Sequence, residues 1–247
     1  MRVLGVIPAR LGSTRLPNKP LQMLAGEPLI TRVVQRVQEH GLVDELVVAT
    51  DSPMVAQVVE RSQVRAVLTA RGHLSGTDRA GEVAARPEYA GFDIVVNVQG
   101  DEPFLTREAL TGAIDRVARG DDVGTAAAPL DPALAGDPAR VKVVTDARSR
   151  ALYFSRAAIP HLRDVTDQGP SRYWQHLGIY AYTRGALLRW STLEPSQAEL
   201  AERLEQLRAL HYGLRIGVAL LTEPVEPGID TPDDLRRAEA HWHALQR

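Results

Sequence analysis

The sequence contains no cysteine, and this absence excludes both disulfide bonds and thiolate metal sites. It has no apolar run that approaches the roughly 20 residues needed to cross a bilayer. The apolar residues at positions 3–7 stop at Pro8, so the N-terminus does not have the charged-then-apolar layout of a secretory signal. We therefore expect a protein that does not bind membranes, and the cytoplasm is its expected compartment.

An excess of charge of one sign is also absent. The formal net charge is −2, and aromatic residues make up 5% of the chain. Nucleic-acid binding calls for a basic surface, with aromatic side chains among the basic ones where single strands are bound, so we expect no nucleic-acid partner. With 44% hydrophobic and 24% charged residues, the 247-residue chain fits one large globular α/β domain. Any cationic site must therefore be local.

Two common phosphate-binding motifs, G-x-x-x-x-G-K-[ST] and G-x-G-x-x-G, are missing at the N-terminus, which argues against a P-loop kinase or a dinucleotide dehydrogenase. The apolar run leads instead into a different loop, residues 7–20, with the sequence Ile-Pro-Ala-Arg-Leu-Gly-Ser-Thr-Arg-Leu-Pro-Asn-Lys-Pro. It carries Arg10, Arg15 and Lys19 and no acidic residue. Cations after a strand of a parallel sheet suit a polyphosphate, although a solvated loop is the alternative.

The first half of the chain alternates short apolar runs with helical patterns, which predicts a mostly parallel sheet with right-handed crossovers. The expected strands are 3–7, 45–50, 64–68 and 93–98. Helices are expected after Pro28 with Leu29, Ile30, Val33, Val34 and Val37 inward, after Asp51 or Ser52, from about 78 to 86, and after Thr106 with Ala109, Leu110, Ala113, Ile114 and Val117 inward.

The second half is less regular and predicts a mixed sheet. Strands are expected at 123–129, 141–145, 151–154, 178–182 and 216–221. We expect one helix capped by Ser196 with Leu200, Leu204 and Leu207 inward, and a terminal helix that begins at 231–234. Residues from about 158 to 173 have the composition of an irregular loop. We expect a single α/β core whose second half extends into an arm.

Two aspartates are candidates for metal binding. Asp101 comes just after the expected central strand, so it should lie near the 8–20 loop at the carboxyl edge of the sheet. Asp230 follows the last expected strand and precedes the last helix. Carboxylates beside bound phosphates are the ligands that Mg²⁺ prefers. The alternatives are that Asp101 belongs only to a turn and that Asp230 is an ordinary helix cap.

Eight segments together resemble the 3-deoxy-manno-octulosonate cytidylyltransferase family, also called CMP-KDO synthetases. They are residues 7–21 (IPARLGSTRLPNKPL), 47–51 (VVATD), 75–79 (SGTDR), 97–103 (NVQGDEP), 151–156 (ALYFSR), 176–182 (HLGIYAY), 204–210 (LEQLRAL) and 228–235 (GIDTPDDL). They occur in the family's order along the whole chain. The first, NVQGDEP, and HLGIY with LEQLR are the specific ones; the others occur in further nucleotidyltransferases.

The resemblance implies an α/β fold of the nucleotide-diphospho-sugar transferase (Rossmann-like) type, with a mostly parallel central sheet flanked by helices and a mixed second half with a dimerisation arm. It implies one cytidylyltransferase domain over 1–247, with a nucleotide-binding half at 1–130 and a sugar-binding and dimerisation half at 131–247. The expected assembly is a homodimer. The implied reaction transfers CMP from CTP to 3-deoxy-D-manno-octulosonate (KDO), giving CMP-KDO and pyrophosphate for lipopolysaccharide biosynthesis.

Site residues are carried over by matching positions. Catalysis is expected from Arg10, Lys19, Asp101 and Asp230, of which the two aspartates would bind Mg²⁺. CTP would be held by Ala9, Arg10, Ser13, Arg15, Lys19, Ser75 and Gly76. KDO would be held by Arg79, Gln99, Arg156, His176, Tyr180, Glu205 and Gln206.

Several of these residues also have purely structural interpretations. Tyr180 lies in an apolar strand and fits a core position, His176 fits a structural histidine, and Arg156 fits a salt bridge at a strand end. Glu205 and Gln206 fit plain helix surface. Two other functions remain open from the sequence. One is a cytidylyltransferase for a related sugar acid, such as amino-KDO or a nonulosonate. The other is a nucleotide-binding protein without catalysis, which would bind CTP without releasing pyrophosphate.

Overall fold

The computed structural model describes residues 1–73, 75–163 and 173–245. The chain forms two compact units, Met1–Leu105 with Glu226–Arg247 and Thr106–Val225. This division differs from the expected halves, 1–130 and 131–247, in two ways: the first unit ends at Leu105, and the C-terminal segment returns to it. Which half binds which substrate stays a prediction.

The first unit is built on four parallel strands in the order β6-β1-β4-β5. They are β1 (Val3–Ala9), β4 (Glu45–Thr50), β5 (Arg65–Leu68) and β6 (Ile94–Val98). All four were predicted, and the parallel pairing is confirmed. Strands β1 and β6 are almost wholly buried, and this burial accounts for their runs of mostly apolar residues.

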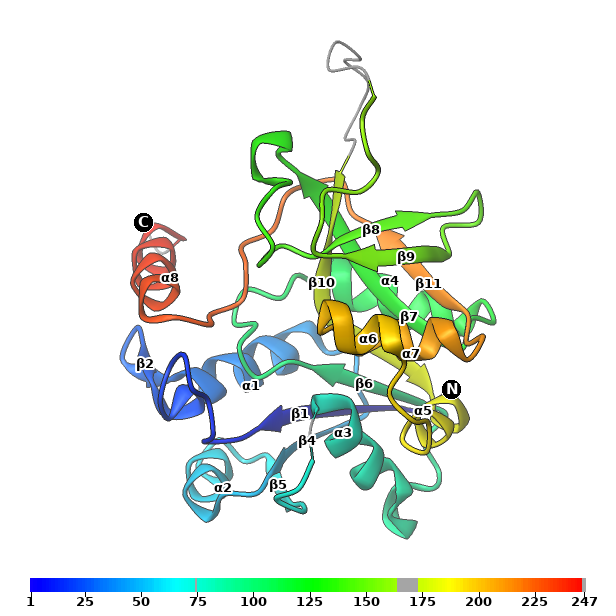
Figure 1. Cartoon of the computed structure of the whole chain (residues 1–247). Coiled ribbons are helices and arrows are strands. Elements are labelled where there is room, and N and C mark those ends of the chain that lie inside the picture. The colour runs from blue at the N-terminus through cyan, green and yellow to red at the C-terminus, as the bar shows by residue number, and fades with distance from the viewer. Residues whose placement is uncertain (74, 164–172, 246–247) are drawn as a thin grey trace. The chain divides into compact units, whose positions relative to one another are not determined.

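Helices α1 (Leu29–His40), α2 (Pro53–Glu60), α3 (Gly76–Ala85) and α8 (Pro232–Leu245) accompany this sheet (Figure 1). Shorter elements are η1 (Lys19–Leu21), β2 (Met23–Leu24), β3 (Glu27–Pro28) and η2 (Pro87–Tyr89). The predicted apolar stripe of α1 is buried throughout. Of the two caps proposed for α2, it is Ser52 that accepts a hydrogen bond from the N–H of Val55, at 3.4 Å. The crossovers to β4 and β5 run in one direction and that to β6 in the other, so right-handed connections place α3 on the opposite face from α1 and α2.

The second unit has a mixed sheet in the order β11-β7-β10, with β8 paired to β10 and β9 paired to β8. Its strands are β7 (Val123–Leu130), β8 (Lys142–Thr145), β9 (Ala151–Ser155), β10 (Tyr173–Thr183) and β11 (Ile216–Leu220). Strand β7 is antiparallel to β10 and parallel to β11. Strand β10 begins at Tyr173 rather than at the predicted position 178, and its register against β7 shifts between His176 and Tyr180.

The helices of the second unit are α4 (Arg107–Ala118), η3 (Pro132–Leu134), α5 (Arg184–Trp190), α6 (Gln197–Glu202) and α7 (Gln206–His211). Thr106 caps α4 by accepting a hydrogen bond of 3.2 Å from the N–H of Ala109, as predicted. The inner face of α4 is buried at four of its five predicted positions. The fifth, Ile114, is half-buried.

The prediction of one helix after Ser196 is wrong. Two short helices, α6 and α7, are separated by residues 203–205, and the first of these, Arg203, has a left-handed φ of 55°. Leu200 is 62% exposed instead of facing inward, whereas Leu204 and Leu207 are buried. The reason is Glu199: it faces the interior to pair with the buried Arg208, at 2.8 Å and 2.5 Å, and so turns its neighbour Leu200 outward.

The irregular loop expected at about 158–173 is described only in part. Residues 158–163 have no helix or strand, in agreement with the prediction, while Tyr173 already belongs to β10. The rest of this loop, residues 164–172, lies outside the described residues. Within the described ranges, no helix has the length and apolar character that a membrane span requires.

Candidate active site

A cavity of about 350 Å³ opens in the first unit at the carboxyl ends of β1 and β6. It is lined by every site residue that the sequence predicted within this unit: Ala9, Arg10, Ser13, Arg15, Lys19, Ser75, Gly76, Arg79, Gln99, Asp101 and Asp230. Sequence reasoning left out five further lining residues, namely Pro8, Gly12, Thr14, Pro20 and Gly100. All five lie in the motif segments 7–21 and 97–103, but none of them is charged, so their chemistry did not mark them as candidates.

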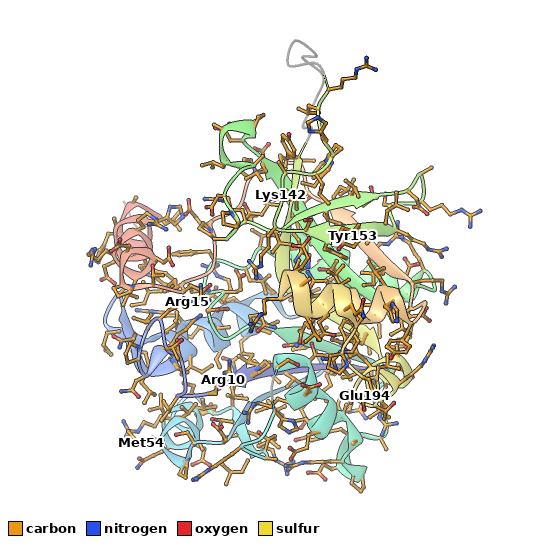
Figure 2. The ribbon with its side chains drawn as sticks, viewed as in Figure 1. Arg10, Arg15, Met54, Lys142, Tyr153 and Glu194 are labelled. Carbon is orange, nitrogen blue, oxygen red and sulfur yellow. The ribbon has the colours of Figure 1, made fainter. Side chains whose placement is uncertain are left out.

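The loop from Arg10 to Asn18 carries Arg10 and Arg15, two of the cations that line this cavity (both are labelled in Figure 2). The Ser13 hydroxyl accepts a hydrogen bond of 3.3 Å from the N–H of Leu16, which turns the loop on itself. Asn18 then adopts a left-handed φ of 52° and η1 begins at Lys19. Asparagine tolerates this conformation better than most residues, and it directs the chain so that Lys19 faces the cavity.

Lys19 is held by two carboxylates that are 82 and 211 positions away in the sequence. Its Nζ donates to Asp101 Oδ2 and, over 2.8 Å, to Asp230 Oδ1. Arg15 reaches the same Asp230 oxygen at 3.0 Å. Two cations and two carboxylates therefore form a compact cluster whose formal charges cancel. We call these four residues the charge cluster.

Local structure explains why Asp230 is available to this cluster. Helix α8 is capped by its neighbours: Asp234 Oδ2 accepts from the N–H of Thr231 at 2.8 Å, and Thr231 Oγ1 accepts from the N–H of Asp234 at 3.2 Å. The helix-cap interpretation of Asp230 is therefore wrong. Its carboxylate faces Lys19 and Arg15 instead.

Electrostatics keep the ammonium of Lys19 charged. Burial acts to lower its pKa, but the Coulombic attraction and hydrogen bonds of Asp101 and Asp230 outweigh burial and raise the pKa above the ordinary value. Its side chain is 14% exposed. A largely buried ammonium that is charged at pH 7 is suited to binding phosphate oxygens.

Two glycines let backbone segments approach closely at the cavity. A Cβ on Gly100 would lie 2.8 Å from the carbonyl oxygen of Pro8. A Cβ on Gly76 would lie 3.2 Å from Gln99 Oε1 and 3.3 Å from Pro8 Cγ. Glycine at these positions brings the start of α3 and the end of β6 against the end of β1, which gives the cavity its shape.

One face of α3 fixes the segment that leads into the cavity. Arg79 donates to Thr69 Oγ1 and, at 3.3 Å, to the carbonyl oxygen of Ala70 and to Asp51. One turn on, Glu82 accepts from the N–H of Ala70 at 2.9 Å and meets the His73 ring at 2.5 Å. These contacts hold the chain just before Ser75 and Gly76.

Glu82 remains ionised in this arrangement. Burial acts to raise its pKa, but hydrogen bonds from His73, Ala70 and Arg86 outweigh burial and lower the pKa below its usual value. Arg79, by contrast, is 2% exposed, with its guanidinium committed to protein oxygens. A contact of Arg79 with KDO stays a prediction. In the structure Arg79 has a bracing role, since its hydrogen bonds hold Thr69 and Ala70 against α3.

The remaining five predicted residues lie in the second unit. The Arg156 guanidinium donates to three carbonyl oxygens, those of Glu202 at 2.7 Å, Pro138 at 2.8 Å and Arg203 at 3.3 Å. This network fixes the break between α6 and α7. The salt-bridge interpretation is therefore replaced by contacts with backbone oxygens, and a contact of Arg156 with the sugar acid stays a prediction.

His176 and Tyr180 lie on β10 and face each other, with ring centroids 5.3 Å apart. Burial lowers the pKa of His176 to about 3, so the ring is neutral at pH 7. The Thr125 hydroxyl donates to the carbonyl of Ile179 at 2.7 Å, which leaves its oxygen to accept from His176 Nε2 at 3.0 Å. Burial first, then the charges of Glu205 and Tyr182, raise the pKa of Tyr180, which stays a neutral phenol.

Glu205 and Gln206 lie where α7 begins, and Gln206 is buried. The interpretation of Gln206 as plain helix surface is therefore wrong, whereas Glu205 is half-buried. For a metal ion, the described residues contain no group of three histidine, cysteine or acidic side chains. The candidate ligands are therefore the pair Asp101 and Asp230. Two carboxylates suit Mg²⁺, because this ion takes its other ligands from phosphate oxygens and water.

A cationic loop after β1, paired aspartates and a parallel sheet in the first unit are the features expected of a nucleotidyltransferase, and the comparisons with known proteins assign the chain to this class. The family model described as "Cytidylyltransferase" matches residues 4–216. A solved structure, CMP:2-keto-3-deoxy-manno-octonic acid synthetase complexed with CTP, is 39% identical, covers 99% of this chain and 100% of its own, and has a TM-score of 0.91. The 4-diphosphocytidyl-2C-methyl-D-erythritol synthase of Anaerococcus prevotii, at 15% identity and a TM-score of 0.62, covers 100% of this chain and 99% of its own and shares the fold alone.

Two curated relatives specify the family. The 3-deoxy-manno-octulosonate cytidylyltransferase of Gemmatimonas aurantiaca is 53% identical over 99% of this chain and 96% of its own length. That of Proteus mirabilis is 43% identical over 98% of each chain. This chain belongs to the 3-deoxy-manno-octulosonate cytidylyltransferase family. The expected family and the expected α/β fold are both confirmed.

Proposed function

We propose that this chain transfers CMP from CTP to KDO and releases pyrophosphate, the reaction that supplies activated KDO for lipopolysaccharide. The observation that carries the proposal is the convergence of Arg10, Arg15 and Lys19 with two aspartates in one cavity. The oxygens of a triphosphate need cations to bind them, and the transfer reaction needs positive charge beside the reacting phosphate to stabilise its transition state.

In this reaction the anomeric hydroxyl of the sugar attacks the α-phosphorus of CTP, and pyrophosphate leaves in line with it. Charge spreads over the phosphate oxygens, so positioning and electrostatic stabilisation dominate catalysis. We assign Arg10 and Lys19 to the triphosphate and the leaving group, with Ser13 and Arg15 assisting. Ala9, Ser75 and Gly76 would contact CTP through the backbone and small side chains that line the cavity.

Asp101 and Asp230 would hold Mg²⁺. The fit rests on their chemistry and position, because both carboxylates already meet at one ammonium nitrogen in the cavity. When bound there, Mg²⁺ would orient the α-phosphate and lower the pKa of the attacking hydroxyl. The two aspartates would hold the ion in place, and Lys19 and Arg15 would supply the remaining positive charge.

KDO is a polyhydroxylated acid, so its binding site needs a cation and neutral hydrogen-bonding groups. We retain Arg79, Gln99, Arg156, His176, Tyr180, Glu205 and Gln206 as the proposed contacts. The neutral states of His176 and Tyr180 suit hydroxyl recognition. The buried, bonded state of Arg79 favours a bracing role for it over a direct salt bridge with the sugar carboxylate.

The test is a pyrophosphate-release assay in which CTP is varied against UTP and ATP, and KDO against amino-KDO and sialic acid. We expect turnover with CTP and KDO. Turnover with sialic acid alone would show that the acceptor is a nonulosonate and not KDO. Binding of CTP without pyrophosphate release under any pairing would mean a nucleotide-binding protein without catalysis. A homodimer and a cytoplasmic location complete the proposal; light scattering during size-exclusion chromatography tests the dimer.

A further inference from the structure

The charge cluster places a lysine ammonium between the two carboxylates proposed for metal binding. Nζ of Lys19 lies 2.8 Å from Asp230 Oδ1 and also bonds to Asp101, and Arg15 lies 3.0 Å from the same Asp230 oxygen. A divalent cation bound to these oxygens would lie close to the ammonium, and their repulsion in a partly buried site is strong. The ammonium and the metal therefore compete for the same oxygens.

We propose that Lys19 acts as an internal counter-ion that keeps the metal site closed until the nucleotide binds. This inference rests on the proposed function. The CTP triphosphate attracts Lys19 and Arg15 away from the carboxylates, because its oxygens carry more negative charge than either aspartate. The transfer of the two cations to phosphate leaves Asp101 and Asp230 free to bind the metal.

Geometry supports this exchange. Lys19 begins η1, directly after the left-handed Asn18, so its long side chain pivots from a fixed backbone position. Asp101 and Asp230 are fixed by main chain, since the N–H of Ile229 donates to the carbonyl of Asp101 at 2.9 Å. The main chain thus fixes the positions from which the two short aspartate side chains extend, while the longer Lys19 side chain has more freedom to move to the phosphate. Nucleotide and metal binding become coupled, and the coupling is reciprocal.

The experiment measures metal affinity in the absence of nucleotide. Mn²⁺ is titrated into the full chain, and the loss of the free Mn²⁺ signal in electron paramagnetic resonance reports binding. Wild type, Lys19→Ala, Lys19→Arg and Arg10→Ala are compared, with circular dichroism to check folding. Arg10 is the matched control because it lines the same cavity, while among the described residues it forms no ion pair.

We expect Lys19→Ala to bind Mn²⁺ about tenfold or more tightly than wild type, because one competing charge is gone. Lys19→Arg should restore the weak binding of wild type, and Arg10→Ala should differ little from it. Equal affinity in wild type and Lys19→Ala overturns the inference, as does equal tightening in Arg10→Ala, which would reveal only a general charge effect. A wild-type enzyme that turns over CTP and KDO while failing this test would leave the proposed function intact.

Discussion

The backbone N–H of Ile229 donates a hydrogen bond of 2.9 Å to the carbonyl oxygen of Asp101. This contact joins the residue before Asp230 to Asp101 itself, so the two carboxylates are fixed relative to each other through the main chain. Side-chain packing alone would leave them freer to separate. A metal site assembled from distant segments needs such a constraint, because a misplaced ligand costs affinity.

Removal of one carboxylate should stop catalysis without unfolding the chain. We expect Asp101→Ala to lower the rate of pyrophosphate release by more than about a hundredfold, since one of the two proposed metal ligands is lost. The thermal unfolding curve should stay cooperative. Asp233→Ala is the control, because Asp233 is exposed on α8 and pairs only at the surface with Arg236. Activity of Asp101→Ala within tenfold of wild type would reject the metal role.

A methyl group at Gly100 should distort the cavity. Its Cβ would lie 2.8 Å from the carbonyl oxygen of Pro8, a backbone atom that cannot rotate away. We expect Gly100→Ala to lower the free energy of unfolding by about 1–3 kcal/mol and to weaken CTP binding. Gly136→Ala, where a Cβ meets nothing within 4 Å, should leave both unchanged. Urea unfolding and a CTP titration measure the two effects; a Gly100→Ala protein with unaltered stability and CTP affinity would contradict this role of the glycine.

Loss of the Glu82 charge should loosen the segment before Ser75. We expect Glu82→Gln to raise the KM for CTP by about tenfold, the equivalent of one lost charge-assisted hydrogen bond, while kcat changes little. The control is Glu88→Gln, whose carboxylate pairs with Arg65 at 3.2 Å on the surface. A fall in kcat with an unchanged KM would show that Glu82 acts elsewhere.

The same residue has a pH signature. Because the pKa of Glu82 is lowered on folding, its stabilisation is complete above the ordinary value of 4.5 and is lost as the pH falls through the lower folded pKa. Wild type should therefore lose stability in acid faster than Glu82→Gln does. Chemical unfolding at a series of pH values below about 5 detects the difference.

His176 should make the protein sensitive to mild acid. Its folded pKa of about 3 lies below the ordinary 6.5, so the unfolded chain binds more protons between these values. Stability should therefore fall as the pH is lowered from about 6.5 toward 3, with a slope from this group of at most about 1.4 kcal/mol per pH unit. His176→Asn should flatten the curve, whereas replacement of the exposed His243 by asparagine should not. Parallel curves for wild type and His176→Asn would show that the ring is protonated in the folded protein.

The local signals in the sequence predicted much of the fold. The run at 3–7 gave β1, and Thr106 marked the start of α4 because its hydroxyl caps the helix. The break at Arg203 was not predictable in this way. Neither glycine nor proline marks it, and the buried pairing of Glu199 with Arg208, which turns Leu200 outward, depends on tertiary contacts.

The candidate site, too, was only partly predictable from the sequence. That the loop after β1 and the residues after β6 line one cavity follows from the rule that strands of a parallel sheet end at one edge. The pairing of Lys19 with both aspartates could not be read from spacing, because it joins segments up to 211 positions apart. Likewise, the three carbonyl partners of Arg156 carry no side-chain signal in the sequence.

Asp230 lies in the C-terminal segment that completes the first unit, so the charge cluster can form only late in the synthesis of the chain. A ribosome completes β1, β6 and the entire Thr106–Val225 unit before Asp230 is made. Until then, Lys19 and Arg15 lack the carboxylate that they share. A growing polypeptide can therefore acquire most of its architecture while it is still unable to assemble the charge cluster.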